Sequence, residues 1–523
     1  MQPIPLASGL TGALLLACSI GAQAPPLSGV AFPVANGRDG SVAYNPRTDQ
    51  YFAAFTVTLP GAKQDNVHGQ LFAADGTLGT YVRFNSVSYG SGHQVAAIQG
   101  NDAFLIGYAG AFYYGNYVLL TALELDGGVR GPSRLDGAND VFSLDVGGEA
   151  SPANDGAIVV VDSAVFGTIR AYDVDTAALT AIGNIDLTTS ATADSVPRIA
   201  AAGGDLGRYL ITWQRQDPTA QGDVYAAIVD RDLRVLVPEF PIATSASNER
   251  SPEVDGDGTH WVVAYVTTEA GASRTDVACR TVTYDTGIGG AKVGAERIVA
   301  GQPGVNEAQP TVAWLGESFL VGFARQFSSG DWDLYATSVE ALSCGPCEGE
   351  FPIATGPFSE RRLQLASERG AGGSGDEAVA LWWRQRAAAT NLTSARAFRA
   401  DDGAVRDRRG GCGLGGQAIA TCAAVGAPSF GLGLRNAERS APAWLLLGST
   451  AAPFRCSGCR LVPVPLVAVP FTTDPRGDAA LVAPLTEPSL VGQTLFAQWL
   501  VAAIGGCPSI GLSFSNALEV TIE

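Results

Sequence analysis

Short apolar runs recur along the chain at a nearly constant interval and are separated by stretches rich in Gly and Asp. Each run ends in a bulky residue, and six of the seven end residues are aromatic: Phe55, Tyr108, Val161, Trp213, Tyr265, Phe323 and Trp383. Subtracting successive positions gives intervals of 53, 53, 52, 52, 58 and 60 residues. A period of this size, held over seven copies, predicts a repeat architecture.

Each repeat is predicted to hold three further strands besides the apolar run. A first strand precedes the run and opens on proline, which suits the first residue of a strand because no ladder donor is needed there. A third strand follows the run and opens on Asp. The clearest copies are Pro197–Ala200, Pro252–Asp255 and Pro310–Ala313 for the first strand, and Asp223–Ala226, Asp276–Cys279 and Asp333–Ala336 for the third.

The fourth strand carries the string Phe-Pro-Ile-Ala-Thr, found at Phe240–Thr244 and Phe351–Thr355. The seventh repeat has a third strand at Thr393–Phe398 but no such string after it, whereas a near-copy, Phe32–Asn36, stands near the start of the chain. We therefore expect Phe32–Asn36 to pair with Thr393–Phe398, which would remove two exposed sheet edges. The alternative is that Phe32–Asn36 is an unrelated apolar stretch.

A four-stranded meander of this length cannot bury both of its faces alone, but radial stacking of several meanders buries them. In period and strand pattern, residues 29–410 resemble secreted bacterial β-propellers of WD40-like shape, although the Gly-His…Trp-Asp signature is absent. The predicted fold class is all-β: a seven-bladed β-propeller closed by an N-terminal strand and followed by a small C-terminal β-sandwich.

The repeat pattern stops near residue 410. Residues 411–523 alternate apolar runs with Gly/Pro turns and predict a small disulfide-carrying β-sandwich. Pro488–Gly492, with Gln498 and Ser515–Ala517, resembles the C-terminal module of many secreted bacterial proteins of unassigned role. Surface anchoring and a stabilising cap are both open as its role.

The first 24 residues have the features of an export signal. Leu10–Ile20 is an apolar core, and Ala22–Ala24 fits a small-residue cleavage pattern. Leu15–Cys18 also resembles a bacterial lipobox, in which Cys18 would be lipidated. The sequence thus predicts a secreted or cell-envelope protein, with an outer-membrane lipoprotein attached through Cys18 as the alternative.

Composition narrows the possible partners. Charged residues make up only 16% of the chain and the net charge is −18, which argues against nucleic acid and against an anionic membrane surface. Past the leader, no apolar run reaches the 18 residues of a membrane span. We expect a monomer without a cofactor, whose partner is an unidentified polymer, protein or surface ligand.

Eight cysteines remain after Cys18, an even number that suits an oxidising compartment. Disulfides are favoured over zinc because the two C-x-x-C pairs lie far apart and the chain has only three histidines. The expected pairs are Cys412–Cys422, Cys344–Cys347 and Cys456–Cys459. Cys279 is expected to be a buried thiol.

Motifs that would carry catalysis are absent from the sequence. The chain has neither a Gly-x-Ser-x-Gly elbow nor a P-loop. The stretch Asp255–Gly258 has the closely spaced carboxylates of a Ca²⁺ loop but also fits a plain hairpin turn. No catalytic, cofactor or metal residues are therefore assigned.

The sequence leaves two functions open. The favoured one is a non-catalytic exported scaffold that binds its ligand through loops. The alternative is a carbohydrate-active or other hydrolase at the mouth of the central channel, with Glu253 and Asp255 as candidate acids. Paired carboxylates from different repeats would favour the enzyme.

Overall fold

The computed structural model describes residues 31–522 with internal gaps. Outside it lie residues 1–30 and 523, gaps of one or two residues, and the segments 59–64, 85–89, 99–102, 149–155, 164–166, 189–192, 201–206, 217–220, 286–288, 368–376, 386–390, 400–403, 408–410, 426–429 and 504–510. The expected leader and the lipidation candidate Cys18 therefore fall outside the described residues.

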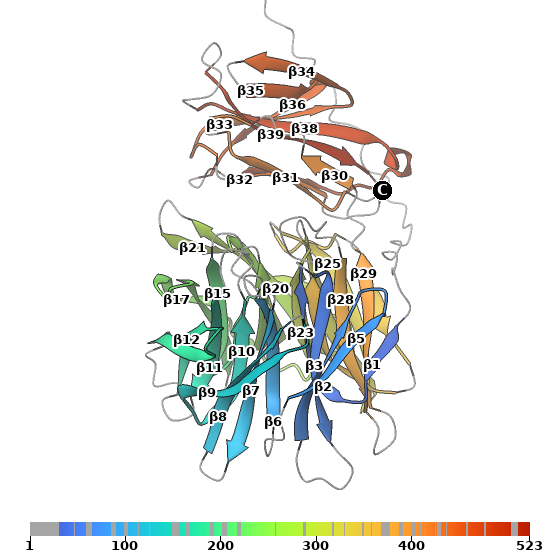
Figure 1. The fold of residues 1–523 in the computed structure, drawn as a ribbon. Helices are drawn as coiled ribbons and strands as arrows, with labels where there is room; N and C mark the ends of the chain where they lie inside the picture. Colours follow the sequence, from blue (N-terminus) through green and yellow to red (C-terminus); the bar gives the residue numbers. More distant parts are fainter. Residues whose placement is uncertain are drawn as a thin grey trace, which may run out of the picture.

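Residues 32–399 form a series of antiparallel sheets, one for each predicted repeat, here numbered sheets 1 to 7 in chain order (Figure 1). Sheet 1 holds β2 (Arg38–Asn45), β3 (Gln50–Thr58), β4 (Asp65–Phe72) and β5 (Leu78–Phe84). Sheet 2 holds β6 (Gly90–Ile98), β7 (Ala103–Phe112), β8 (Gly115–Glu124) and β9 (Val129–Asn139). Sheet 3 holds β10 (Val141–Gly147), β11 (Gly156–Ser163), β12 (Thr168–Asp175) and β13 (Thr180–Asp186).

The remaining sheets follow the same order. Sheet 4 holds β14 (Ala193–Ile199), β15 (Arg208–Gln216), β16 (Gly222–Asp230) and β17 (Val235–Ala243). Sheet 5 holds β18 (Asn248–Gly256), β19 (His260–Thr268) and β20 (Asp276–Asp285), with both β21 (Gly290–Val293) and β22 (Arg297–Ala300) paired to β20. Sheet 6 holds β23 (Asn306–Trp314), β24 (Ser318–Ser328), β25 (Asp331–Glu340) and β26 (Phe351–Ala354). Sheet 7 holds β27 (Glu360–Ser367), β28 (Glu377–Gln385), β29 (Asn391–Arg399) and β1 (Phe32–Ala35).

The hydrophobic cores lie between neighbouring sheets. The apolar runs become the second strands, and β-branched and aromatic residues suit such strands because both faces are covered. One core joins Leu210 and Ile228 of sheet 4 to Trp261 and Val263 of sheet 5, and all four side chains are fully buried. At about 1.5–3 kcal/mol for each large side chain removed from water, these contacts hold the sheets face to face.

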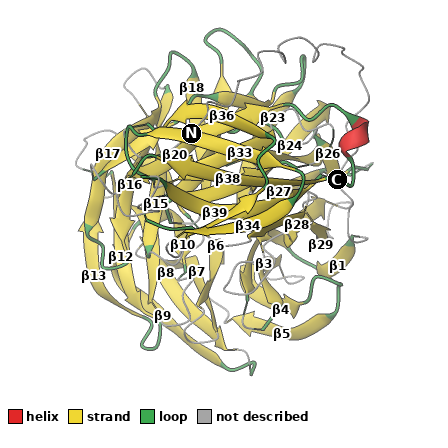
Figure 2. Ribbon diagram, turned by 90° about the horizontal axis from the view of Figure 1, so that it is seen from above, coloured by secondary structure: helices red, strands yellow, loops and turns green. Residues whose placement is uncertain are grey.

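The first strands surround the axis of this assembly. In Figure 2, β6 and β10 lie nearer the centre than β9 and β13, the last strands of the same two sheets. Each contacts the first strand of the next sheet, in the order β2, β6, β10, β14, β18, β23 and β27, and β27 contacts β2 again. The contacts therefore run in a circle.

The N-terminal strand completes sheet 7, as the sequence predicted. In β1, Phe32 lies opposite Ala395 and Pro33 opposite Ser394 of β29, and Figure 1 shows the blue β1 beside the orange β29. The other two copies of the string pair with their third strands in the same way, with Phe240 opposite Ala226 and Phe351 opposite Ala336. In all three copies the register shifts right after the proline, and the next residue, Val34, Ile242 or Ile353, is buried.

The C-terminal strands form a separate module at one end of the ring (Figure 1). A five-stranded sheet has the order β30-β39-β38-β33-β36 and a three-stranded sheet the order β31-β32-β37, with β34-β35 as a hairpin. The two larger sheets share a core that includes Leu432, Leu445 and Trp499. Strand β30 pairs with β39 although it precedes the boundary expected at residue 411. The strands are β30 (Ala404–Asp407), β31 (Gln417–Thr421), β32 (Phe430–Arg435), β33 (Pro442–Gly448), β34 (Ala451–Cys456), β35 (Cys459–Pro463), β36 (Val467–Thr472), β37 (Ala479–Ala483), β38 (Thr494–Val501) and β39 (Ser513–Thr521).

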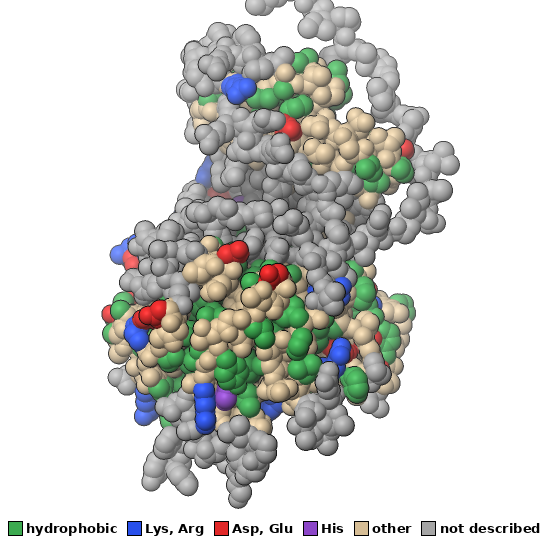
Figure 3. All heavy atoms as spheres, turned by 45° about the vertical axis from the view of Figure 1, so that its right-hand side comes forward, with side chains coloured by type: hydrophobic (Ala, Val, Ile, Leu, Met, Phe, Trp, Pro, Cys, Tyr) green, Lys and Arg blue, Asp and Glu red, His purple; other side chains and the backbone are tan. Residues whose placement is uncertain are grey.

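A disulfide and two ion pairs join the module to the ring. Cys347, which follows β25, is bonded to Cys422, which follows β31. The guanidinium of Arg439 lies 3.5 Å from Asp285, and Lys292 lies 3.6 Å from Asp474. On the face seen in Figure 3, described charges of both signs are scattered. Among the described residues, no helix is long and apolar enough to cross a membrane.

Candidate functional site

A β-bulge interrupts the first strand of every sheet at a similar place. The pairing with the second strand shifts between Arg38 and Ser41, Ser91 and Gln94, Val141 and Leu144, Ser195 and Arg198, Arg250 and Glu253, Ala308 and Thr311, and Arg361 and Gln364. Five of these bulges contain a non-glycine residue with a positive φ of 50–55°: Asp39, Val196, Ser251, Gln309 and Arg362. Bulges of this kind re-aim side chains and are common beside functional sites.

The first strands of sheets 4, 5 and 6 begin earlier than the sequence predicted. Strands β14, β18 and β23 begin four residues before Pro197, Pro252 and Pro310, and each proline lies inside the bulge. Proline is tolerated in a bulge because the ladder is already broken there. A proline within an otherwise strand-like stretch therefore marks the bulges of sheets 4, 5 and 6.

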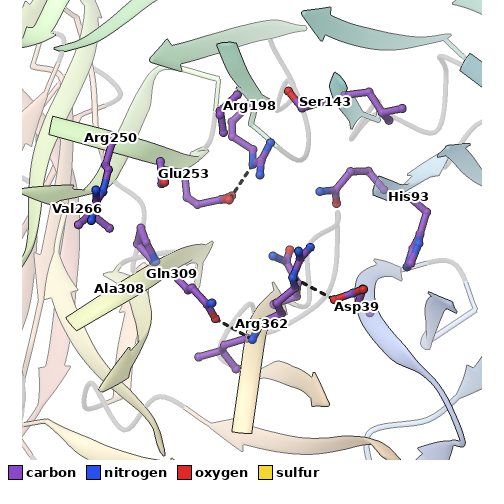
Figure 4. Close-up of a pocket in the computed structure, with 18 of the residues that line it drawn as sticks. Asp39, His93, Ser143, Arg198, Arg250, Glu253, Val266, Ala308, Gln309 and Arg362 are labelled. Carbon is purple, nitrogen blue, oxygen red and sulfur yellow. Dashed lines mark hydrogen bonds and ion pairs between the residues drawn. The ribbon is translucent and has the colours of Figure 1, made fainter. Parts of the chain in front are cut away.

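The bulges of all seven sheets line one cavity of about 610 Å³ (Figure 4). Because the first strands surround the axis, this cavity is the central channel of the ring. Its lining includes three arginines, Arg198, Arg250 and Arg362, and amide side chains from three sheets. The cavity volume is within the range of small-molecule sites.

Two ion pairs cross between neighbouring sheets in the cavity. Arg198 of sheet 4 lies 2.7 Å from Glu253 of sheet 5, and Arg362 of sheet 7 lies 3.0 Å from Asp39 of sheet 1 (Figure 4). Asp39 also accepts a hydrogen bond from Arg38 at 2.7 Å. The side chain of Arg362 is 60% exposed, so its guanidinium is accessible to a ligand.

Glu253, one of the two predicted acids, lines the cavity. Burial raises the pKa of its carboxyl above the ordinary value, and the nearby Arg198 opposes this rise. Asp145, behind the lining, has its pKa raised to about 7, chiefly by burial. Asp145 accepts a hydrogen bond from the Ile199 amide at 3.0 Å and therefore ties sheet 3 to sheet 4.

Asp255, the other predicted acid, does not line the cavity. It is buried and accepts a hydrogen bond from the amide of Trp314 in the next sheet at 2.8 Å. Asp255 and Gly256 end β18, and Gly258 precedes β19, so this stretch is a hairpin connection. Among the described residues no three His, Cys, Asp or Glu side chains form a group that could hold a metal ion.

His93 lines the cavity, and both nitrogens of its ring contact other residues of the protein. Its Nε2 lies 3.0 Å from the Ala54 carbonyl, which can only accept, so Nε2 carries the proton. Its Nδ1 lies 3.4 Å from the Thr56 hydroxyl. Burial lowers the pKa of His93 to about 4, so the ring is neutral at pH 7. The His93 ring therefore links sheet 2 to sheet 1.

Phe142 supplies an apolar surface to the same cavity. It is 73% exposed, the highest value among the exposed large hydrophobic residues of the described chain. Asp162 fixes its backbone by accepting hydrogen bonds from the amides of Phe142 at 2.8 Å and Ser143 at 2.6 Å. Sequence reasoning missed Phe142, because an isolated phenylalanine has no pattern that separates it from a core residue.

Two of the three expected disulfide pairs are wrong. Cys422 is bonded to Cys347, not to Cys412, and Cys344 is a free, buried thiol. Cys412 is disulfide-bonded to a cysteine other than Cys422. Closeness in sequence does not decide which cysteines pair, because pairing depends on which loops meet in space.

The remaining cysteine predictions have different outcomes. Cys279 is a free, buried thiol, as predicted. The backbones of Cys456 and Cys459 face each other across the β34–β35 hairpin. Their side chains fall outside the described residues, so the Cys456–Cys459 bond stays a prediction.

Comparison with known proteins gives no family. No family model matches the chain, and no curated protein matches it. Among solved structures it is similar to an ulvan lyase of polysaccharide lyase family PL25, with 10% identity over 70% of this chain and 95% of that one and a TM-score of 0.48. It is also similar to the β-propeller domain of the Trilobed protease from Pyrococcus furiosus, with 9% identity over 70% and 95% of the two chains and a TM-score of 0.42. The chain is all-β, with repeated four-stranded antiparallel sheets and β-propeller structures among those it is similar to.

Proposed function

We propose that this protein is an exported seven-bladed β-propeller, closed by β1 and followed by a C-terminal β-sandwich, that binds a carboxylate-bearing saccharide in its central channel. The circular contacts of the first strands and the β1–β29 pairing support the closed ring. The Cys347–Cys422 disulfide supports an oxidising compartment. Plain secretion and attachment through Cys18 are both compatible with this proposal.

The binding proposal rests on the side chains that line the channel. Guanidinium groups pair with carboxylates in a planar, bidentate manner, and Arg362 is exposed enough to do so. The amides of Gln94, Gln309 and Gln364 suit sugar hydroxyls because they both donate and accept hydrogen bonds. Phe142 offers a flat apolar face on which a sugar ring can stack.

Calorimetric titration with size-matched tetramers of galacturonic acid and galactose tests this proposal. We expect the acidic tetramer to bind and the neutral one to bind at least tenfold more weakly. Arg362→Gln and Phe142→Ala should each weaken binding about tenfold, which corresponds to about 1.4 kcal/mol. The control Arg234→Gln removes a 76%-exposed arginine outside the channel lining and should change nothing. Equal binding of both tetramers, or none, would contradict the proposal.

A second candidate is a hydrolase acting at the same place, and Glu253 is the observation that favours it. Its pKa is raised by burial, and a raised pKa suits a general acid at neutral pH. Asp39, the other carboxyl in the lining, is held by two arginines. Release of new reducing ends from the acidic tetramer, abolished by Glu253→Gln but not by Arg234→Gln, would establish the hydrolase. Binding without turnover would establish the scaffold.

A further inference from the structure

Two buried thiols meet at the junction of sheets 5 and 6. Cys279 lies in β20, opposite Ala264 of β19. Cys344 lies in the connection between β25 and β26, and both side chains are fully buried in one hydrophobic cluster. Burial, and after it the neighbouring Cys279 thiol, raise the pKa of the Cys344 thiol. They come from different sheets, so a bond between them would join two repeats.

The backbone around Cys344 is firmly held. The Cys344 amide donates to the Glu340 carbonyl at 3.2 Å, and the Glu340 amide donates to the Gly345 carbonyl at 2.8 Å. Three residues later, the Cys347 amide donates to Ser338, and its sulfur is bonded to Cys422. Cys344 itself has a φ of 57°, a left-handed conformation uncommon for a residue with a side chain. The connection thus holds the Cys344 thiol against Cys279.

We propose that Cys279 and Cys344 form a second disulfide, which covalently links sheet 5 to sheet 6. With Cys347–Cys422, this bond would make the β25–β26 connection a junction between sheet 5, sheet 6 and the C-terminal module. The proposal does not depend on what the channel binds.

The bond forms by exchange with a disulfide oxidant such as oxidised glutathione. One cysteine thiolate attacks the oxidant, releasing one reduced glutathione and leaving a mixed disulfide. The second cysteine then attacks that mixed disulfide and releases the second glutathione. Two thiol protons leave the protein, two electrons pass to the oxidant, and one S–S bond of about 2 Å replaces the thiol contact.

The burial of the two sulfurs determines when the disulfide can form. Because both sulfurs are inaccessible in the folded chain, the oxidant reaches them before sheets 5 and 6 close, so the bond forms during folding. Reduced, folded protein should therefore resist oxidation, whereas protein refolded with oxidised glutathione should contain the bond.

The test is refolding of the full chain from denaturant with a mixture of reduced and oxidised glutathione, followed by alkylation under denaturing, non-reducing conditions and peptide mass spectrometry. The paired variant Cys347→Ala/Cys422→Ala simplifies the analysis, because Cys344 and Cys347 lie on one tryptic peptide. We expect the peptide that contains Cys279 to be linked to the one that contains Cys344. Alkylation of both cysteines in the refolded wild type would overturn the proposal.

A second measurement excludes a mere packing effect. Cys279→Ala should lower the melting temperature of the oxidised protein by several degrees more than that of the reduced protein, because only the oxidised protein loses a cross-link. An equal loss in both redox states would show that Cys279 acts only by packing and would also overturn the proposal.

Discussion

The guanidinium of Arg362 lies 3.0 Å from the carboxylate of Asp39, and each residue lies in the first-strand bulge of its sheet. Both have a positive φ, 50° for Arg362 and 55° for Asp39. Sheet 7 therefore meets sheet 1 through a contact between two bulges. On the outer side of the same junction, β1 is a strand of sheet 7, and the chain continues from β1 directly into β2, the first strand of sheet 1.

The burial of β1 is the first testable feature. Val34→Ala should lower the free energy of unfolding by about 1–3 kcal/mol, since it removes apolar contacts of a 5%-exposed side chain. Urea denaturation measures the change. The matched control is Pro33→Ala, because Pro33 is exposed in the same strand. Equal effects of the two substitutions would contradict the burial of Val34. A separate variant, deletion of residues 29–36, should promote aggregation because it exposes the edge of β29.

Asp145 should make stability depend on pH. Its folded-state pKa of about 7 is above its ordinary value of 3.8, so the folded protein binds more protons between pH 4 and 7. Its contribution to stability is therefore lost as the pH rises through this window, by up to about 4 kcal/mol. Asp145→Asn should flatten this part of the stability profile, as measured by denaturation at a series of pH values. An unchanged slope in the variant would show that Asp145 ionises without penalty.

His93 should have the opposite effect on acid stability. Its folded-state pKa of about 4 is below the ordinary 6.5, so the unfolded chain binds more protons between these values. Stability should therefore fall as the pH decreases from 6.5 to 4, by up to about 3 kcal/mol. His93→Gln keeps an amide that can donate to the Ala54 carbonyl and should remove this loss. NMR titration of the His93 ring should show it neutral at pH 6.

The Cys347–Cys422 bond should control the attachment of the C-terminal module. Cys422→Ala removes the covalent link and leaves the ion pairs Arg439–Asp285 and Lys292–Asp474 between module and ring. Such partly exposed pairs contribute about 0–1 kcal/mol each. We expect faster cleavage between residues 400 and 410 in limited proteolysis. Arg439→Gln, as control, should change the rate little, and an unchanged rate in Cys422→Ala would show that noncovalent packing alone holds the module.

The sequence alone was sufficient to predict the repeated second strands of the ring and the strand that completes sheet 7. The apolar runs ending at Phe55 and Trp213 lie in buried second strands, and the pairing of Phe32–Asn36 with the last repeat could be read from a missing string. Both inferences succeeded because strand formation depends on local features, namely β-branched and aromatic residues between turns, that recur in every repeat.

The channel and the cysteine partners were decided by the tertiary structure. Phe142, Arg362 and Gln309 belong to different repeats and share no local pattern, and they line one cavity only because the bulges place them on one axis. Glu253 and Asp255 look alike in sequence, yet Glu253 lines the channel whereas Asp255 accepts a hydrogen bond from the next sheet, because Asp255 lies two residues farther along β18, beyond the lining of the cavity. Cys422 pairs with Cys347 rather than with nearby Cys412 because a disulfide requires closeness in space, which the docking of the module onto the ring provides.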